Sequence, residues 1–167
     1  MSDNTFEFKC FTDSPLRLES GQALQDITVA YTCEGQLNES KDNAILICHA
    51  LTGDANASDW WHEVVGPGKA IDTNTHFVIC SNTLGGCKGT TGPDSINPQS
   101  NTPYHLDFPV ITISDMVTVQ HELISHLEIP RLKMVIGGSM GGMQALEWAA
   151  RYPDKIRSCV PIAATSK

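Results

Sequence analysis

The sequence predicts an α/β fold in which helices cover both faces of a mainly parallel sheet. Four apolar runs have the length of strands buried on both faces: Ala44–Cys48, His76–Cys80, Leu132–Ile136 and Ile156–Ala163. Helical patterns separate these runs. Strands that alternate with helices form β-α-β units and hence a parallel sheet.

Two further strands are expected near the start. Phe6–Phe11 and Ile27–Cys33 are rich in residues that favour strands, and we expect them to be antiparallel. Ser81–Pro109 is rich in Gly, Pro, Asn, Ser and Thr, which predicts a long loop. Long loops in compact domains are often functional.

Three helices are expected. A short one lies within Asp59–Ile71, interrupted by a Gly-Pro-Gly sequence. The second carries apolar residues at helical spacing; a capping box of Thr112 and Asp115 starts it and Pro130 stops it. The third spans Met143–Arg151.

The composition indicates one globular domain. The chain has 167 residues, of which 41% are hydrophobic, enough for a sizeable core, and this excludes a disordered chain. The net charge of −8 and the lack of a basic run argue against a nucleic-acid or anionic-membrane surface, because both need clustered positive charge. The polar N-terminus lacks a signal pattern and the apolar runs are too short for a bilayer, so we expect a cytoplasmic protein.

Six cysteines would allow three disulfides. However, Cys48, Cys80 and Cys159 lie in apolar, strand-like runs, where cysteine packs as a small hydrophobe, and no CxxC pair is present. We therefore expect free thiols in a reducing compartment, and no metal site.

The strongest chemical signal is the sequence from Gly137 to Gly142, G-G-S-M-G-G, between a predicted strand and a predicted helix. A G-x-S-x-G motif in this context is typical of a nucleophile elbow, which presents the serine hydroxyl above the sheet. Glycines at 137 and 141 let the strained turn close without steric clash. We therefore predict that Ser139 is a nucleophile.

Two nucleotide-binding interpretations fit less well. A dinucleotide fingerprint needs G-x-G-x-x-G, but Ser139 occupies the place of the middle glycine, and no acidic residue ends the next strand. The glycine-rich stretch Gly85–Gly92 lacks the G-K-[ST] order of a phosphate-binding loop.

The expected oxyanion hole consists of two backbone amides. One belongs to Met140, the residue after the nucleophile, and the other comes from the loop after an earlier strand, for which we choose Leu51 within HALTG. His49 in the same loop is expected to brace it through hydrogen bonds rather than to react.

The chain offers no obvious general base. A triad of this kind runs serine, acid, histidine, but no histidine follows Ser139, and Glu147 and Asp154 look like solvated charges. Of the six earlier histidines, His121 and His126 are expected at the surface. His62, beside two tryptophans, is expected to pack or to line a pocket.

Four segments resemble homoserine O-acetyltransferases of the α/β-hydrolase superfamily. They are HALTGDAN (residues 49–56), NTLGGCKGTTGPDSINP (82–98), ISDMVTVQHELISHLEI (113–129) and GGSMGGMQALEWAARYPD (137–154). The resemblance covers nearly the whole chain. Similar families are homoserine O-succinyltransferases, serine O-acyltransferases and deacetylcephalosporin acetyltransferases.

The resemblance implies an α/β-hydrolase fold and transfer of an acetyl group from acetyl-CoA to L-homoserine, for methionine biosynthesis. Acetyl-CoA is then a co-substrate, no bound cofactor is expected, and the full-length enzyme is a homodimer. Members of the family continue beyond this length with further strands, a lid and the triad Asp and His. Residues 1–167 are thus expected to form a partial core, with only Ser139, Leu51 and Met140 from the catalytic set.

Other functions remain open at this point. The alternatives are a succinyl donor, serine as the acceptor, and a serine esterase or thioesterase, which would use the same elbow. The chain alone is expected to be an inactive fragment because it lacks the base. Its last strand is expected to expose an apolar edge and to lower solubility.

Overall fold

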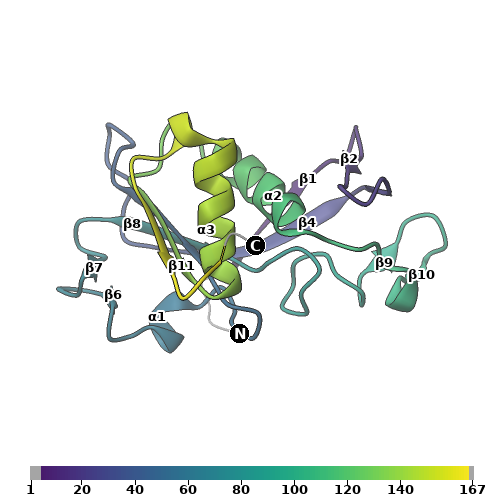
Figure 1. The fold of residues 1–167 in the computed structure, drawn as a ribbon, viewed down its shortest axis with the longest axis horizontal. Coiled ribbons are helices and arrows are strands. Elements are labelled where there is room, and N and C mark those ends of the chain that lie inside the picture. The colour runs from purple at the N-terminus through teal and green to yellow at the C-terminus, as the bar shows by residue number, and fades with distance from the viewer. Residues whose placement is uncertain (1–4, 166–167) are drawn as a thin grey trace.

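The computed structural model of the protein describes residues 5–165. At its centre is a six-stranded sheet in the order β1-β4-β8-β5-β11-β12 (Figure 1). Its strands are β1 (Thr5–Cys10), β4 (Ile27–Glu34), β5 (Ala44–Cys48), β8 (Phe77–Ser81), β11 (Met134–Gly138) and β12 (Cys159–Ile162). β4 is antiparallel to both its neighbours, whereas β8–β5, β5–β11 and β11–β12 are parallel pairs. The predicted fold class and all six predicted strands are confirmed.

Two long helices cover one face of the sheet. α2 (Ile113–His126) and α3 (Met140–Arg151) lie side by side there (Figure 1). Leu123 from α2 and Trp148 from α3 are fully buried in the same core as Leu46 of β5. Burial of this apolar surface is the main force that holds the helices to the sheet.

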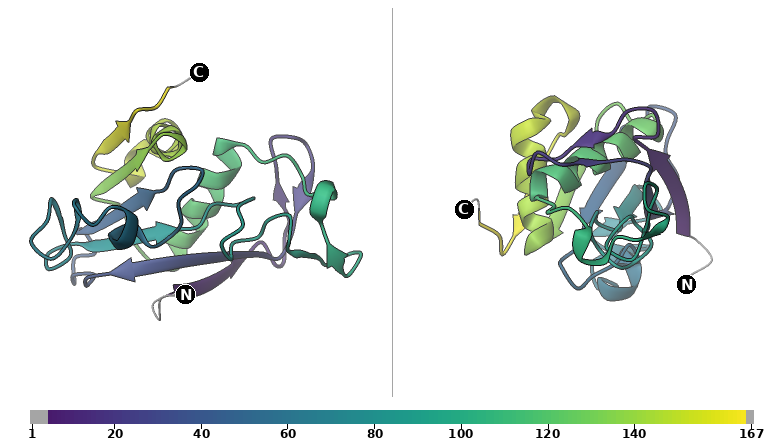
Figure 2. Two further views of the ribbon diagram at one scale, coloured as in Figure 1. Left: turned by 90° about the horizontal axis from the view of Figure 1, so that it is seen from below. Right: turned by 90° about the vertical axis from the view of Figure 1, so that its right-hand side faces the viewer.

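A smaller core lies on the opposite face. Ile45 and Ile47 of β5 point there and pack with Ala57 of α1 (Ala57–Trp60) and with Val65. Figure 2 shows α1 and its loops against the sheet, away from α2 and α3. β5 is therefore buried on both faces, as its unbroken apolar sequence predicted.

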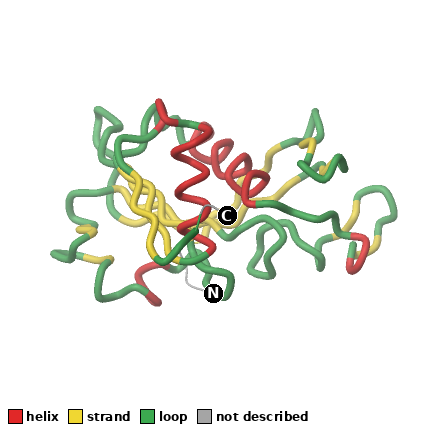
Figure 3. Tube along the Cα trace, viewed as in Figure 1, coloured by secondary structure: helices red, strands yellow, loops and turns green. Residues whose placement is uncertain are grey.

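Within residues 5–165, three pairs of short strands and two 3-10 turns lie outside the six-stranded sheet. They are β2 (Leu16–Arg17) with β3 (Ala23–Leu24), β6 (Val65–Gly66) with β7 (Ile71–Asp72), β9 (Ile96–Asn97) with β10 (Thr102–Pro103), and the 3-10 turns η1 (His105–Asp107) and η2 (Pro153–Lys155). Most of the predicted loop between β8 and α2 is irregular (Figure 3). Only the β9–β10 hairpin and η1 interrupt it.

One predicted helix is wrong. The chain between Asp59 and Ile71 is not a helix of useful length, because α1 ends at Trp60 and turns follow. Gly66 and Gly68 have φ of 143° and 71°, which a right-handed helix cannot contain. The two glycines therefore exclude a helix through residues 66–68, and α1 has already ended before them, at Trp60.

The other two helices begin at different signals. The capping box of α2 is present: the Asp115 amide donates to Thr112 Oγ1 at 3.3 Å, and the Thr112 amide donates to Asp115 Oδ2 at 2.9 Å. α3 begins at Met140, three residues earlier than predicted, and includes Gly141 and Gly142. Their packing against the sheet outweighs the low helix propensity of glycine.

The structure contains free cysteines, as the sequence predicted. All six cysteines are free thiols, and Cys87 is the exposed one. Within the described residues, no helix has the length and apolar character needed to cross a bilayer.

Candidate active site

The chain makes a sharp bend at Ser139, where β11 ends and α3 begins. Ser139 has φ 56° and ψ −121°, a conformation that non-glycine residues rarely adopt. Its amide donates to the Ile162 carbonyl of β12 at 2.9 Å, and its carbonyl accepts the Met143 amide at 3.1 Å. Both hydrogen bonds hold the strained residue in place, as expected for a functional turn.

Two glycines allow β5 to approach this bend. A Cβ on Gly141 would overlap the carbonyl group of Cys48, the last residue of β5. A Cβ on Gly137 would meet the same carbonyl oxygen at 2.6 Å. No side chain larger than hydrogen fits at either position without moving the backbone.

The Ser139 side chain is exposed at the N-terminus of α3. Among residues 5–165, its hydroxyl makes no hydrogen bond, and neither does the Met140 amide. The first amides of a helix have no partner within it and carry partial positive charge. A negative charge that develops on an atom bonded to Ser139 Oγ would therefore face a favourable field.

Leu51 lies at the same edge of the sheet. Cys48 pairs with Gly137 in parallel register, so the residues after each strand leave the sheet together. Leu51 is in the turn that follows β5 and its side chain is 78% exposed. In the part of the chain that the structure describes, its amide has no acceptor, which leaves it available to a ligand.

His49 braces this turn. Its ring is buried, Nδ1 lies 2.7 Å from the Ala50 carbonyl oxygen, and Nε2 lies 3.2 Å from the Thr83 amide nitrogen. Because an amide can only donate, Nε2 accepts and Nδ1 carries the proton. Burial lowers the pKa of His49, partly opposed by the Ala50 carbonyl and the charge of Asp54. The neutral ring is thus fully occupied in holding the loop.

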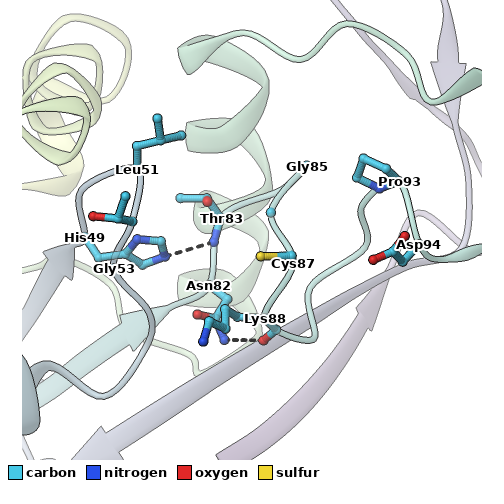
Figure 4. Close-up of a pocket in the computed structure, with 12 residues that line it drawn as sticks. His49, Leu51, Gly53, Asn82, Thr83, Gly85, Cys87, Lys88, Pro93 and Asp94 are labelled. Atoms are coloured by element: carbon cyan, nitrogen blue, oxygen red, sulfur yellow. Dashed lines mark hydrogen bonds between the residues drawn. The ribbon is translucent and has the colours of Figure 1, made fainter. Parts of the chain in front are cut away.

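A pocket of about 290 Å³ opens beside this turn (Figure 4). Its walls are the turn at residues 49–53 and the loop after β8, at residues 82–88, 93 and 94. Asn82 holds that loop, since its side chain accepts the Ala55 amide at 2.8 Å and donates to the Lys88 carbonyl oxygen at 2.5 Å. The predicted loop therefore forms one wall of this pocket.

Several residues named from the sequence lie elsewhere. His62 is exposed and does not line this pocket, so its predicted packing role is wrong. His121 is not a simple surface group, because it is half-buried and stacks on Tyr152 with ring centres 4.2 Å apart. Burial lowers its pKa. His126 is exposed, as expected.

The two acidic residues after the bend differ. Asp154 is exposed, as predicted. Glu147 is half-buried on α3, with Oε1 3.9 Å from Arg151 Nε one helical turn later. Among the described residues, neither forms a hydrogen bond with a histidine.

Sequence reasoning missed two residues that shape this region. Asn82 follows a buried strand at its carboxyl end, where polar residues commonly serve a site. Gln120 is a polar residue within the apolar stripe of α2, and it is buried. A polar residue at a core position is the signal that would have found it.

Comparison with known proteins gives a consistent result. The family described as alpha/beta hydrolase fold matches residues 43–167. A homoserine O-acetyltransferase from Solidesulfovibrio magneticus is 54% identical over 165 residues, covering 93% of this chain and 42% of that protein. One from Methanococcus vannielii is 59% identical over 160 residues, covering 90% and 32%. The chain thus spans less than half the length of these relatives.

Solved structures of proteins with two different activities are similar to this chain. A homoserine O-acetyltransferase from Bacillus anthracis has a TM-score of 0.82 and 38% identity, over 92% of this chain and 44% of that one. The acetyl esterase MekB has a TM-score of 0.85 and 30% identity, over 98% and 45%. With the strand order and the bend at Ser139, these matches establish that the chain belongs to the alpha/beta hydrolase fold family and that its sequence is similar to homoserine O-acetyltransferases.

Proposed function

We propose that this chain is the N-terminal portion of an acyltransferase that moves an acetyl group from acetyl-CoA to the hydroxyl of L-homoserine. The observation that carries the proposal is the strained, exposed Ser139 at the sheet edge where β5 also ends, together with the Met140 and Leu51 amides, which have no acceptor among the described residues. The similarity to homoserine O-acetyltransferases at 54% and 59% identity supports the choice of reaction.

In the first half-reaction, Ser139 Oγ attacks the thioester carbonyl carbon. A base from outside residues 1–167 takes the hydroxyl proton, and the Leu51 and Met140 amides donate to the oxyanion. The intermediate collapses, the carbon–sulfur bond breaks, and CoA leaves as a thiol with that proton. An acetyl ester on Ser139 remains.

In the second half-reaction, the homoserine hydroxyl attacks the acetyl ester. The base takes its proton, the same two amides stabilise the oxyanion, and the proton passes to Ser139 Oγ as the ester bond breaks. The products are O-acetylhomoserine and free enzyme. Water must be kept from the ester for transfer to win over hydrolysis. The pocket between residues 49–53 and 82–88 is a candidate acceptor channel.

Hydrolysis is the second candidate function. The similarity of this fold to the acetyl esterase MekB favours it, since the same serine and amides would serve an ester and water. Succinyl transfer and serine as acceptor are variants of the first proposal.

The test uses the full-length protein with acetyl-CoA. A burst of CoA release that Ser139→Ala abolishes supports the acyl-enzyme, and retained transfer by that variant would end the proposal. The ratio of O-acetylhomoserine to acetate, measured with and without homoserine, separates transferase from hydrolase. Residues 1–167 alone should turn over at background, since they lack the base.

A further inference from the structure

A buried chain of hydrogen bonds lies beneath the Ser139 bend. Trp148 Nε1 donates to Gln120 Oε1 at 2.8 Å, and Gln120 Nε2 donates to Gln144 Oε1 at 2.6 Å. The Cys48 thiol also donates to Gln120 Oε1, at 3.8 Å. All four side chains are at most 3% exposed.

The direction of these hydrogen bonds is fixed by chemistry. An indole N–H can only donate, so the carbonyl oxygen of the Gln120 amide must face Trp148. The Gln120 NH₂ group therefore faces Gln144, which must present its own oxygen. Burial raises the pKa of Cys48 to about 12, so this residue stays a thiol that donates. Gln120 is the single hub, with two donors on one side and one acceptor on the other.

The hub joins the two segments that carry the oxyanion-hole amides. Cys48 ends β5, three residues before Leu51, and Gln144 and Trp148 belong to α3, which begins at Met140. Gln120 belongs to α2, which is a separate element from both β5 and α3. It therefore cross-links β5 to α3 from the side of the sheet that is packed away from solvent.

Polar groups at this place need an explanation. An apolar side chain would fill the same core without the cost of burying amides, and the Gln144 Nε2 atom finds no acceptor within the described residues. Hydrogen bonds are directional, so a buried polar network fixes one arrangement of the elements that it joins, although burying it costs free energy. Apolar contacts do not fix the arrangement in this way.

We propose that Gln120 is a positioning residue for the reaction at Ser139. It sets the separation between the Leu51 and Met140 amides, so that both reach one oxyanion. The inference rests on the proposed acylation of Ser139, and it applies equally if water is the final acceptor. An error of about 1 Å in such a site can cost about 100-fold in rate.

The first test compares Gln120→Leu with Val117→Ala in the full-length protein. Val117 is fully buried on the same helix, so its truncation is the control for lost core stability. Gln120→Leu should lower the kcat of Ser139 acylation by about 10- to 100-fold with KM within about twofold, whereas Val117→Ala should lower Tm and keep kcat. If Gln120→Leu keeps kcat, or if both variants lose kcat alike at equal loss of Tm, the proposal is wrong.

Gln120→Glu supplies a readout that a purely structural role would not move. When protonated, the introduced carboxyl can accept from Trp148 and donate to Gln144 as the amide does; when ionised, it cannot donate. Because burial raises the pKa of a carboxyl, the kcat ratio of this variant to the wild type should be near one at low pH and fall as pH rises. A ratio that does not change with pH contradicts the proposal.

A measurement that does not depend on turnover separates this proposal from the proposed function. In the ¹⁵N-labelled full-length protein, Gln120→Leu should shift the amide resonances of both Leu51 and Met140, and Val117→Ala should shift neither to the same extent. Unchanged Leu51 and Met140 resonances would overturn the positioning role. If wild-type Ser139 is never acylated, the proposed function fails while this amide result still stands.

Discussion

The carbonyl group of Cys48 occupies the space that a side chain on Gly141 would need. Cys48 ends the central strand β5 and Gly141 lies in the first turn of α3. The end of the strand and the beginning of the helix are thus in direct contact. This contact is what brings the turn after β5 beside the bend at Ser139.

Gly141→Ala should therefore destabilise the protein. The added methyl must push the strand end from the helix, and overpacking of this kind typically costs about 1–3 kcal/mol. Urea unfolding measures the effect. Gly138→Ala is the matched control, because a Cβ there meets nothing within 4 Å, and it should change stability much less. Equal stability of the two variants would contradict the packing described here.

Ser139→Gly should be more stable than Ser139→Ala. Both remove the hydroxyl, but only glycine adopts a positive φ without strain, and such strain is worth about 1–3 kcal/mol. The difference in unfolding free energy between the two variants measures the cost of the positive φ at residue 139. An alanine variant as stable as the glycine variant would mean that the bend is unstrained.

Acidification should destabilise the fold through His49. Burial lowers the pKa of His49 in the folded chain. Below a pH of about 6.5, which is the pKa of histidine in the unfolded chain, the unfolded state therefore binds a proton that the folded state does not bind. Stability should then fall as pH drops from 7 to 5. His49→Gln keeps a donor and an acceptor without a titrating group, so its stability should depend less on pH. The half-buried His121 contributes in the same direction and remains in both proteins.

Thiol labelling of the native protein should occur first at Cys87. It is the exposed cysteine, whereas burial raises the pKa of Cys48, Cys33 and Cys10 to about 12 and keeps them protonated. Peptide mapping after brief alkylation checks this. Cys87→Ser should remove the rapid phase; a rapid phase that persists would mean that one of the other five thiols reacts as readily as the exposed one.

The strands and the bend could be predicted because their signals are local. A run such as Ala44–Cys48 is apolar at every position, which only a strand buried on both faces requires. The G-x-S-x-G spacing around Ser139 specifies a strained turn for which few alternatives exist. The capping box at Thr112 and Asp115 is equally local.

What the sequence did not predict depends on contacts between distant segments. The start of α3 at Met140 follows from how closely Gly141 approaches Cys48, which no single segment encodes. The hub at Gln120 is visible only when α2, α3 and β5 are together. The error at residues 59–71 has another cause: the Gly-Pro-Gly sequence was expected to interrupt a helix, whereas Gly66 and Gly68 have positive φ and α1 ends earlier, at Trp60.

The central claim is that Ser139 carries the acyl group, and peptide mapping of the rapidly quenched full-length protein after mixing with acetyl-CoA tests it most directly. The account predicts an acetyl ester on the peptide that contains Ser139, formed before homoserine is added and removed when homoserine is present. An unmodified Ser139 peptide during active turnover, or an acetyl group on another residue, would contradict it.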